Sequence, residues 1–310
     1  RVGSGGARLL GGSNREHSLL EEELAAWLGR ERVLLFSSGY LAALGAISVL
    51  ARTVDTIYSD RLNHASLIDG VRGTRNARVI YDHATLPPRA TRRGSALIVT
   101  ESIFSMDGDA IDVASVLADL GDDDVLLVDE AHALGLVGSA GAGNARALHD
   151  PRVVVMGTLS KAFGGQGGFI AGPALLIDLL VNAARPFIFD TALPPSVALA
   201  ARVALVLIRD GEDLRARLHA NVQRLREGLA ALGFPTIADR SPIVPFVLGS
   251  EERAVEIAAR LESRKIYAPA IRPPTVPVGT SRIRFSVRAD HHNEHIDLLV
   301  QGLAQCIVTS

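Results

Sequence analysis

Lysine and cysteine are scarce in this sequence of 310 residues. Its 32 basic residues include only two lysines, Lys161 and Lys265. The single cysteine, Cys306, cannot form an internal disulfide, so we expect a reducing compartment, the cytoplasm. No run of about 18 uncharged apolar residues is present, which predicts that no helix crosses a membrane. The net charge of −2 favours neither nucleic acid nor an anionic membrane as a partner.

The length and composition are typical of a globular enzyme. Apolar residues make up 48% of the chain and charged residues 21%, which is enough apolar material for a large core. A chain of this length predicts one large or two medium domains. The sequence begins in a glycine-rich turn without an initiator methionine, and we expect a further N-terminal segment before it.

Short apolar, β-branched runs alternate with helical patterns over the first two thirds of the chain. Strands are predicted at residues 33–36, 56–59, 78–81, 96–101, 125–129, 153–156 and 168–171, and helices between them at 41–50, 66–73, 112–120 and 173–184. This alternation is typical of an α/β fold with a mostly parallel, doubly wound sheet, whose sites lie at the carboxyl ends of the strands. From residue 195 long helices dominate. We therefore expect a large domain over residues 1–209 and a smaller α+β domain over residues 210–310.

Three local patterns complete the prediction of the elements. Ser18-Leu19-Leu20-Glu21 predicts the capped start of the first helix. Lys265 falls at a charged helix end, where a solvated side chain is expected. The last helix is expected from Asp290 onward, and Cys306 in that helix is predicted to be buried.

Lys161 differs from Lys265 in its surroundings. A buried-strand pattern at residues 153–156 precedes it, and four glycines lie among residues 164–168. Glycines at this density indicate tight turns or a close approach of the backbone. We expect Lys161 to be poorly solvated, which lowers the pKa of an amine and suits a lysine that forms a Schiff base.

Asp129 ends an apolar strand, and His132 follows it in Asp129-Glu130-Ala131-His132. One interpretation is the acidic box of a nucleotide-driven helicase. That class also needs a Gly-x-x-x-x-Gly-Lys-Ser/Thr loop, and this sequence has no Gly-Lys pair, so the class is excluded. The other interpretation is a carboxylate that pairs with a protonated ring nitrogen, with a histidine near a ring oxygen, as pyridoxal phosphate requires.

Other candidate residues carry weaker signals. Ser38-Gly39-Tyr40 joins a strand to a helix and could bind an anion at the helix N-terminus, although many such junctions bind nothing. His64 alone would be interpreted as a capping or core histidine, but together with Lys161 and Asp129 we favour a ring stacked on the cofactor. Ser105 could bind a cofactor oxygen or simply order a turn.

Arg272 and Arg284 could bind a substrate carboxylate, because a guanidinium contacts two oxygens at once. Surface arginines are common in this sequence, so this signal is weak by itself. Residues 291–295 contain three histidines, but a closed set of zinc ligands is not evident and we predict solvated histidines rather than a metal site.

Taken together, these residues resemble the α-oxoamine synthases, which are pyridoxal-phosphate enzymes of fold type I. The resemblance extends from Gly3 to the last helix. It rests on the motifs Asn63-His64-Ala65-Ser66, Thr100-Glu101, Phe104-Ser105-Met106-Asp107-Gly108-Asp109, Asp129-Glu130-Ala131-His132, Thr158-Leu159-Ser160-Lys161 and Thr275-Val276-Pro277.

The resemblance implies a role for each matching position. Lys161 would bond to the cofactor and move the substrate's Cα proton, Asp129 would pair with the pyridine nitrogen, and His64 would stack on the ring. His132 and Ser105 would bind the phenolic oxygen. The other implied cofactor residues are Ser38, Gly39, Tyr40, Glu101, Thr158 and, across a dimer interface, Thr191; Arg284 would hold the amino-acid carboxylate, with Arg272 near the acyl entrance.

The resemblance also implies a reaction. A cytoplasmic homodimer, with its active site at the interface, would join L-alanine to a pimeloyl thioester of coenzyme A or acyl carrier protein and release CO2 and the free thiol, in biotin synthesis. A sister activity with glycine or a longer acyl chain is the nearest alternative. A non-catalytic subunit is disfavoured by Lys161, Asp129 and His132, and a dinucleotide oxidoreductase by the lack of Gly-x-Gly-x-x-Gly after the first strand.

Two departures from the family pattern stand out. The family's N-terminal arm, which contributes to carboxylate and acyl binding, is absent from this sequence. Asp190 precedes Thr191 where a small hydroxyl residue is common. Because an acid beside a phosphate would weaken its binding, we expect Asp190 to point elsewhere.

Overall fold

The computed structural model describes residues 2–234 and 241–308. They form two compact units. The first contains the chain up to Ile103 together with Ile111–Gly211, and the second contains Phe104–Ala110 together with the chain from Glu212 onward. The short segment Phe104–Ala110 thus belongs to the second unit although both of its neighbours in sequence belong to the first.

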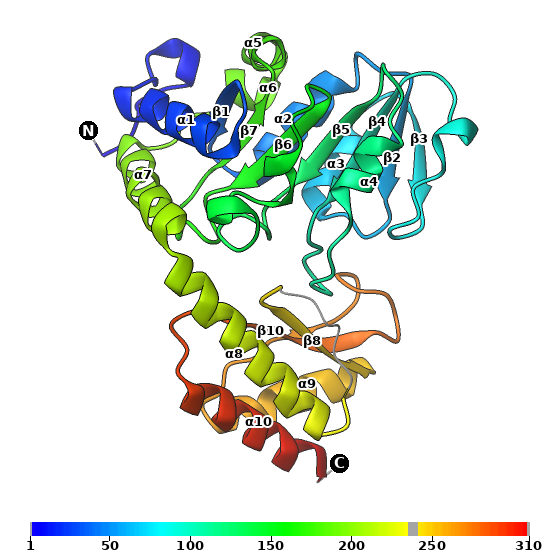
Figure 1. Cartoon of the computed structure of the whole chain (residues 1–310), viewed down its shortest axis with the longest axis vertical. Coiled ribbons are helices and arrows are strands. Elements are labelled where there is room, and N and C mark those ends of the chain that lie inside the picture. Colours follow the sequence, from blue (N-terminus) through cyan, green and yellow to red (C-terminus); the bar gives the residue numbers. More distant parts are fainter. Residues whose placement is uncertain (1, 235–240, 309–310) are drawn as a thin grey trace. The chain divides into compact units, whose positions relative to one another are not determined.

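The first unit is built on a seven-stranded sheet of order β1-β7-β6-β5-β4-β2-β3 (Figure 1). Neighbouring strands are parallel except that β7 is antiparallel to both β6 and β1. The strands are β1 (Arg32–Phe36), β2 (Thr56–Asp60), β3 (Ala77–Tyr81), β4 (Ala96–Glu101), β5 (Val125–Asp129), β6 (Val153–Thr158) and β7 (Gly168–Gly172). All seven strands predicted from the sequence are therefore confirmed.

Helices cover both faces of this sheet. They are α1 (Arg15–Leu28), α2 (Gly39–Leu50), α3 (Ala65–Arg72), α4 (Val113–Ala118), α5 (Ala174–Ala183), α6 (Arg185–Ile188) and α7 (Pro195–Asp210), with 3₁₀ turns at Arg8–Leu10, Arg89–Thr91, Ser139–Gly141 and Asn144–Ala147. Alternate strand residues explain the two layers: Ile98 faces the core beneath α1, α4 and α7, whereas Leu97 and Val99 face the core beneath α2, α3 and α5. The inner strands β4, β5, β6 and β7 are almost completely buried and largely apolar, whereas the edge strand β3 is exposed except at Tyr81. Helices on both faces of a mostly parallel sheet confirm the doubly wound α/β prediction.

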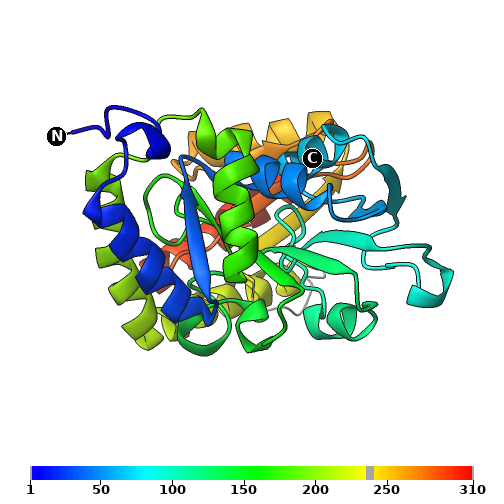
Figure 2. The ribbon, with the colours of Figure 1, turned by 90° about the horizontal axis from the view of Figure 1, so that it is seen from above.

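Two helices distant in sequence pack together on one face of this sheet. Figure 2 shows α1 and α7 running side by side. The guanidinium of Arg202 in α7 binds Glu16 and Glu23 of α1, at 2.6 Å each. The apolar face of α1, including Leu20 and Leu24, is completely buried against the sheet.

The second unit is a small α+β structure, as predicted. Three antiparallel strands lie in the order β8-β10-β9. Its elements are α8 (Glu212–Ala231), β8 (Ile243–Gly249), α9 (Glu251–Ser263), β9 (Ala270–Ile271), β10 (Ser281–Ser286) and α10 (Asn293–Val308). Ile257, Ile283 and Leu303 are completely buried in its core. Cys306 is buried in α10 and Lys265 is exposed, as the sequence predicts.

Two predicted helix starts are wrong. The first helix begins at Arg15 rather than at Ser18: the side chain of Asn14 accepts from the Glu16 N–H (3.1 Å), and His17 Nδ1 accepts from the Asn14 N–H (3.0 Å). A histidine thus supplies the acceptor that capping-box patterns seek in glutamate or glutamine. The last helix begins at Asn293, and Asp290 lies before it, where its carboxylate accepts hydrogen bonds from Arg288.

Within residues 2–234 and 241–308, no helix combines the length and apolar content that a membrane crossing requires.

The corrected helix start can be tested with two exposed positions. Asn14→Ala removes the cap of α1 and should lower the free energy of unfolding by about 1 kcal/mol. Ser18→Ala is the matched control; it lies inside the helix and should change stability by less than about 0.5 kcal/mol. Urea unfolding followed by circular dichroism measures both. A larger loss in Ser18→Ala than in Asn14→Ala would contradict the structure.

Candidate active site

Three predicted site residues lie at the carboxyl ends of adjacent parallel strands. Glu101 ends β4, Asp129 ends β5 and Thr158 ends β6. The register pairs Glu101 directly with Asp129. Lys161 follows three residues after Thr158, in the turn that leads to β7. The parallel topology therefore brings these residues to one edge of the sheet, as the strand-end rule predicts.

Glu101 and Asp129 are buried carboxyl groups, with 2% and 3% of their surface exposed. Burial raises the pKa of Glu101 well above its ordinary value, and the neighbouring charge of Asp129 raises it further. Burial also raises the pKa of Asp129, against the opposing effects of Lys161, the Ala131 N–H and His64. A cationic group placed against Asp129 would favour its ionised form. This environment fits the protonated ring nitrogen of pyridoxal phosphate.

His64 is held in place through its backbone N–H and through its imidazole ring. Its backbone N–H donates to Glu101 Oε1 at 2.6 Å, and its ring Nδ1 accepts from the Ser66 N–H at 3.2 Å, capping α3. Because Nδ1 is an acceptor, we assign the ring proton to Nε2. Desolvation lowers the pKa of His64, and the charge of Lys161 lowers it further while Asp129 opposes the shift. The capping interpretation of His64 is thus confirmed, and its predicted stacking role stays a prediction.

Lys161 corrects one expectation from the sequence. Its side chain is exposed, not poorly solvated. The reason is that β6 ends at Thr158, so Lys161 lies beyond the buried strand, in a turn whose neighbours Ser160 and Ala162 are also exposed. Its ammonium nevertheless lies near enough to the site for its positive charge to lower the pKa of Glu101 and of Asp129.

The N-terminus of α2 approaches the ends of β6 and β7 very closely. A Cβ built on Gly39 would lie 3.2 Å from the Thr158 side chain, and one built on Gly168 would lie 2.4 Å from Gly39 Cα. Ser38 caps α2 by accepting from the Leu41 N–H at 3.1 Å. The first N–H groups of any helix lack partners within the helix, and its dipole favours an anion there. Ser38, Gly39 and Thr158 therefore form a cradle that fits a phosphate group.

The remaining predicted residues of the first unit, Tyr40, His132 and Thr191, are exposed or half-buried. Tyr40 is 41% exposed and its hydroxyl donates to Asp69, which raises the pKa of the phenol. Its backbone N–H, rather than its hydroxyl, is thus the group suited to an anion. His132 is half-buried in the turn after β5, and Thr191 is exposed.

The other three predicted residues belong to the second unit. Arg284 on β10 donates through Nε to the Ser105 carbonyl at 2.6 Å and through Nη1 to the Ser286 hydroxyl at 2.9 Å. Burial lowers the pKa of this guanidinium. Arg272 is exposed. Ser105 and Arg284 are thus adjacent through main chain, a link that the sequence did not reveal.

Glu130 is a buried acid whose role the sequence analysis missed. It is completely buried and accepts hydrogen bonds from Ala145 N–H (2.7 Å), Asn144 N–H (3.1 Å) and the Ser102 hydroxyl (2.9 Å). Burial raises its pKa to about 7. It therefore anchors the loop that follows the Asp129-to-His132 turn. Its place in the motif Asp129-Glu130-Ala131-His132, directly after Asp129, was the signal in the sequence that could have identified it.

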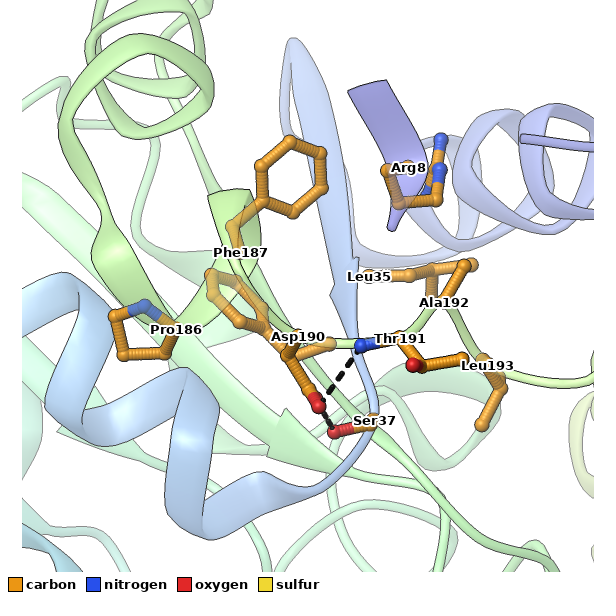
Figure 3. A pocket seen from close by; sticks show the side chains of 10 residues that line it. Arg8, Leu35, Ser37, Pro186, Phe187, Asp190, Thr191, Ala192 and Leu193 are labelled. Carbon is orange, nitrogen blue, oxygen red and sulfur yellow. Dashed lines mark hydrogen bonds between the residues drawn. The ribbon is translucent and has the colours of Figure 1, made fainter. Parts of the chain in front are cut away.

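A small pocket adjoins the cradle at the N-terminus of α2 (Figure 3). It is lined by Arg8, by the end of β1 with Ser37, and by residues 186–187 and 190–193. Asp190 points toward Ser37 and accepts a hydrogen bond from its hydroxyl. The expectation that its carboxylate points away from a bound phosphate stays a prediction. Within the described residues, no group of three or more acidic, histidine or cysteine side chains could hold a metal ion.

The sheet order, the carboxylate at the end of β5, the lysine after β6 and the anion cradle at α2 together define the class of pyridoxal-phosphate transferases of fold type I. The chain belongs to the aminotransferase class I and II family, which matches residues 1–303.

Individual relatives are close. An 8-amino-7-oxononanoate synthase of Methylococcus capsulatus is 45% identical, and the match covers 99% of this chain and 81% of the relative. The solved serine palmitoyltransferase of Sphingomonas wittichii has a TM-score of 0.93 at 31% identity, covering 99% of this chain and 80% of that one. The 8-amino-7-oxononanoate synthase structure from Francisella tularensis has a TM-score of 0.85 at 28% identity, covering 96% and 88%.

The buried carboxyl of Glu130 predicts a pH dependence of stability. Its pKa is about 7 in the folded chain against an ordinary 4.5. The folded state therefore binds the proton more tightly, and this stabilisation is full below about pH 4.5 and is lost as the pH rises toward about 7. The loss amounts to about 3 kcal/mol for a shift of this size.

Glu130→Gln cannot titrate, so its free energy of unfolding should decline less than that of the wild type between pH 4.5 and 7. Urea unfolding at a series of pH values measures the difference. Exposed Glu227→Gln, on α8, is the control and should follow the wild type. Parallel curves for the wild type and Glu130→Gln would show that Glu130 is already ionised in this range.

Proposed function

We propose that this chain is a C-acyltransferase that condenses L-alanine with a pimeloyl thioester, the reaction of 8-amino-7-oxononanoate synthase in biotin synthesis. Its cofactor is pyridoxal 5′-phosphate. The observation that carries the proposal is the meeting, at one edge of the sheet, of the Asp129 carboxylate, the Lys161 amine and the α2 anion cradle. The curated relatives of that name, at 41–47% identity, support alanine and pimeloyl thioester as substrates.

Bound pyridoxal phosphate would supply a protonated ring that takes up the electron pair left by the Cα proton or by CO2. Asp129 would keep the ring nitrogen protonated, and Glu101 would hold the backbone of His64, whose imidazole would lie against the ring. His132 and Ser105 would donate hydrogen bonds to the phenolic oxygen. The cradle of Ser38, Gly39, Tyr40 and Thr158 would hold the phosphate, with Thr191 reaching the partner's phosphate.

Lys161 would act on the substrate as a base. It would remove the Cα proton of alanine, after which the carbon attacks the thioester carbonyl and the thiol leaves. The resulting β-keto acid loses CO2, and Lys161 would return a proton to the carbon. Arg284 would bind the alanine carboxylate through its guanidinium, and Arg272 would lie near the entering acyl chain.

The same proposal includes the domains and assembly. Residues 1–209 would be the cofactor-binding domain and residues 210–310 the small C-terminal domain. Two copies would form a homodimer in the cytoplasm with the active site at their interface. The carrier of the pimeloyl group would be coenzyme A or acyl carrier protein.

A second candidate is a sister reaction with another amino acid or a longer acyl chain. The TM-score of 0.93 to a serine palmitoyltransferase favours keeping it. Product formation by mass spectrometry, with alanine, glycine or serine against pimeloyl-CoA, acetyl-CoA or palmitoyl-CoA, separates the reactions. Preferred turnover of serine with palmitoyl-CoA would replace the first proposal with the second.

The presence of only two lysines gives a clean test of the lysine's role. Purified protein with pyridoxal phosphate should absorb near roughly 420 nm, and borohydride should fix the cofactor on one peptide, the one that contains Lys161. Lys161→Ala should lose the band and at least about a thousandfold in kcat/KM. Lys265→Ala, the control on an exposed site, should keep both. A cofactor fixed on Lys265 would refute the assignment.

The close approach at the cradle can be tested separately. Gly168→Ala places a methyl 2.4 Å from Gly39 Cα, which must displace the N-terminus of α2. We expect the Kd for pyridoxal phosphate to rise at least about tenfold, because such overpacking typically costs about 1–3 kcal/mol. Gly3→Ala is the control, since a Cβ there has nothing within 4 Å. An unchanged Kd in a folded Gly168→Ala variant would argue against the cradle.

A further inference from the structure

Asp190 lies beside the proposed phosphate site, where the negative charge of a carboxylate would repel the phosphate. Its carboxylate accepts a hydrogen bond from the Ser37 hydroxyl and, at 2.9 Å, another from the Thr191 N–H (Figure 3). Ser37 directly precedes Ser38, the capping residue of α2. The acid thus contacts the residue that leads into the anion cradle.

The segment that carries Asp190 is firmly anchored within the first unit. Thr191 forms an antiparallel bridge with Ala7. Three further hydrogen bonds hold the segment to N-terminal residues: Ala192 N–H to the Gly6 carbonyl (2.9 Å), the Ser4 hydroxyl to the Ala192 carbonyl (2.6 Å) and His17 Nε2 to the Leu193 carbonyl (2.6 Å). Ser4 and His17 are buried. Asp190 therefore offers Ser37 an acceptor on a backbone that cannot easily move.

We propose that Asp190 is a positioning residue for the phosphate group of the cofactor: its hydrogen bond holds Ser37 and thereby sets the conformation of the Ser38–Gly39 turn. The inference rests on the proposed cofactor site. Hydrogen bonds to a carboxylate are stronger than those between neutral groups, so this acceptor orients the turn better than the small hydroxyl residue common in the family. Both interactions of the acid are made with protein donors.

Two opposite effects distinguish this role from a mere nearby charge. If the carboxylate only repelled the phosphate, its removal would tighten cofactor binding. If it positions the turn, its removal weakens binding, and only for a ligand that carries the phosphate. Pyridoxal, which lacks that group, separates the two cases and also detects a general loss of structure.

The experiment measures Kd for pyridoxal phosphate and for pyridoxal by absorbance titration of the full chain. Asp190→Ala should weaken pyridoxal phosphate at least about tenfold and leave pyridoxal within about twofold. Asp190→Asn keeps an acceptor oxygen and should restore most of the affinity. Ser37→Ala removes the same hydrogen bond from the other side; it should match Asp190→Ala, and the double variant should be no weaker than either single one.

Asp178→Ala is the control, because Asp178 is an exposed acid on α5 that pairs with Arg32. It should leave both Kd values unchanged. The proposal is overturned if Asp190→Ala binds pyridoxal phosphate as tightly as the wild type or more tightly, or if it weakens both ligands equally. A wild-type chain that binds no pyridoxal phosphate would instead refute the proposed cofactor site.

Discussion

Two carboxyl groups buried side by side impose the main constraint on this structure. Glu101 and Asp129 end neighbouring parallel strands and pair in register, where burial disfavours their ionised forms. Such an arrangement is costly for a folded chain unless positive charge is brought to it. The charge of Lys161 acts on both groups, and His64 is tied to Glu101 by its backbone. The site is thus organised around acids whose favourable state depends on what binds beside them.

The anion cradle of Ser38, Gly39 and Thr158 is subject to a second constraint, which is steric. A helix N-terminus can hold a phosphate only if the backbone of its first turn is accessible. Gly168 lets α2 approach β7 to a distance that no side chain would allow, and Gly39 lets the same helix lie closely against Thr158 of β6. The sequence pattern of glycines around Lys161 is therefore partly explained by packing of strand against helix, not by the conformation of the lysine's own loop.

Much of the fold could be predicted from the sequence, because both faces of the sheet are covered and the inner strands are short runs rich in buried apolar residues. The strand-end position of Asp129 followed from the same pattern, whereas Thr158 was named only through the family resemblance, because the predicted strand stopped at residue 156. Other features could not be predicted, since they depend on contacts distant in sequence. The exposure of Lys161 depends on where β6 stops, and the bond between Asp190 and Ser37 joins residues 153 positions apart. The start of α1 was missed for a local reason, because a histidine stands where the capping-box pattern expects glutamate or glutamine.

The segment Phe104–Ala110 makes the C-terminal unit discontinuous in sequence. Asp107 in this segment pairs with the buried Arg282 of β10, and Gly108 lies so close to Ile243 that a Cβ there would be 2.5 Å from its carbonyl oxygen. During synthesis on the ribosome, these seven residues emerge long before the strands that they pack against. A fragment that starts at residue 212 would therefore lack the partner of the buried Arg282 and the backbone that packs against Ile243.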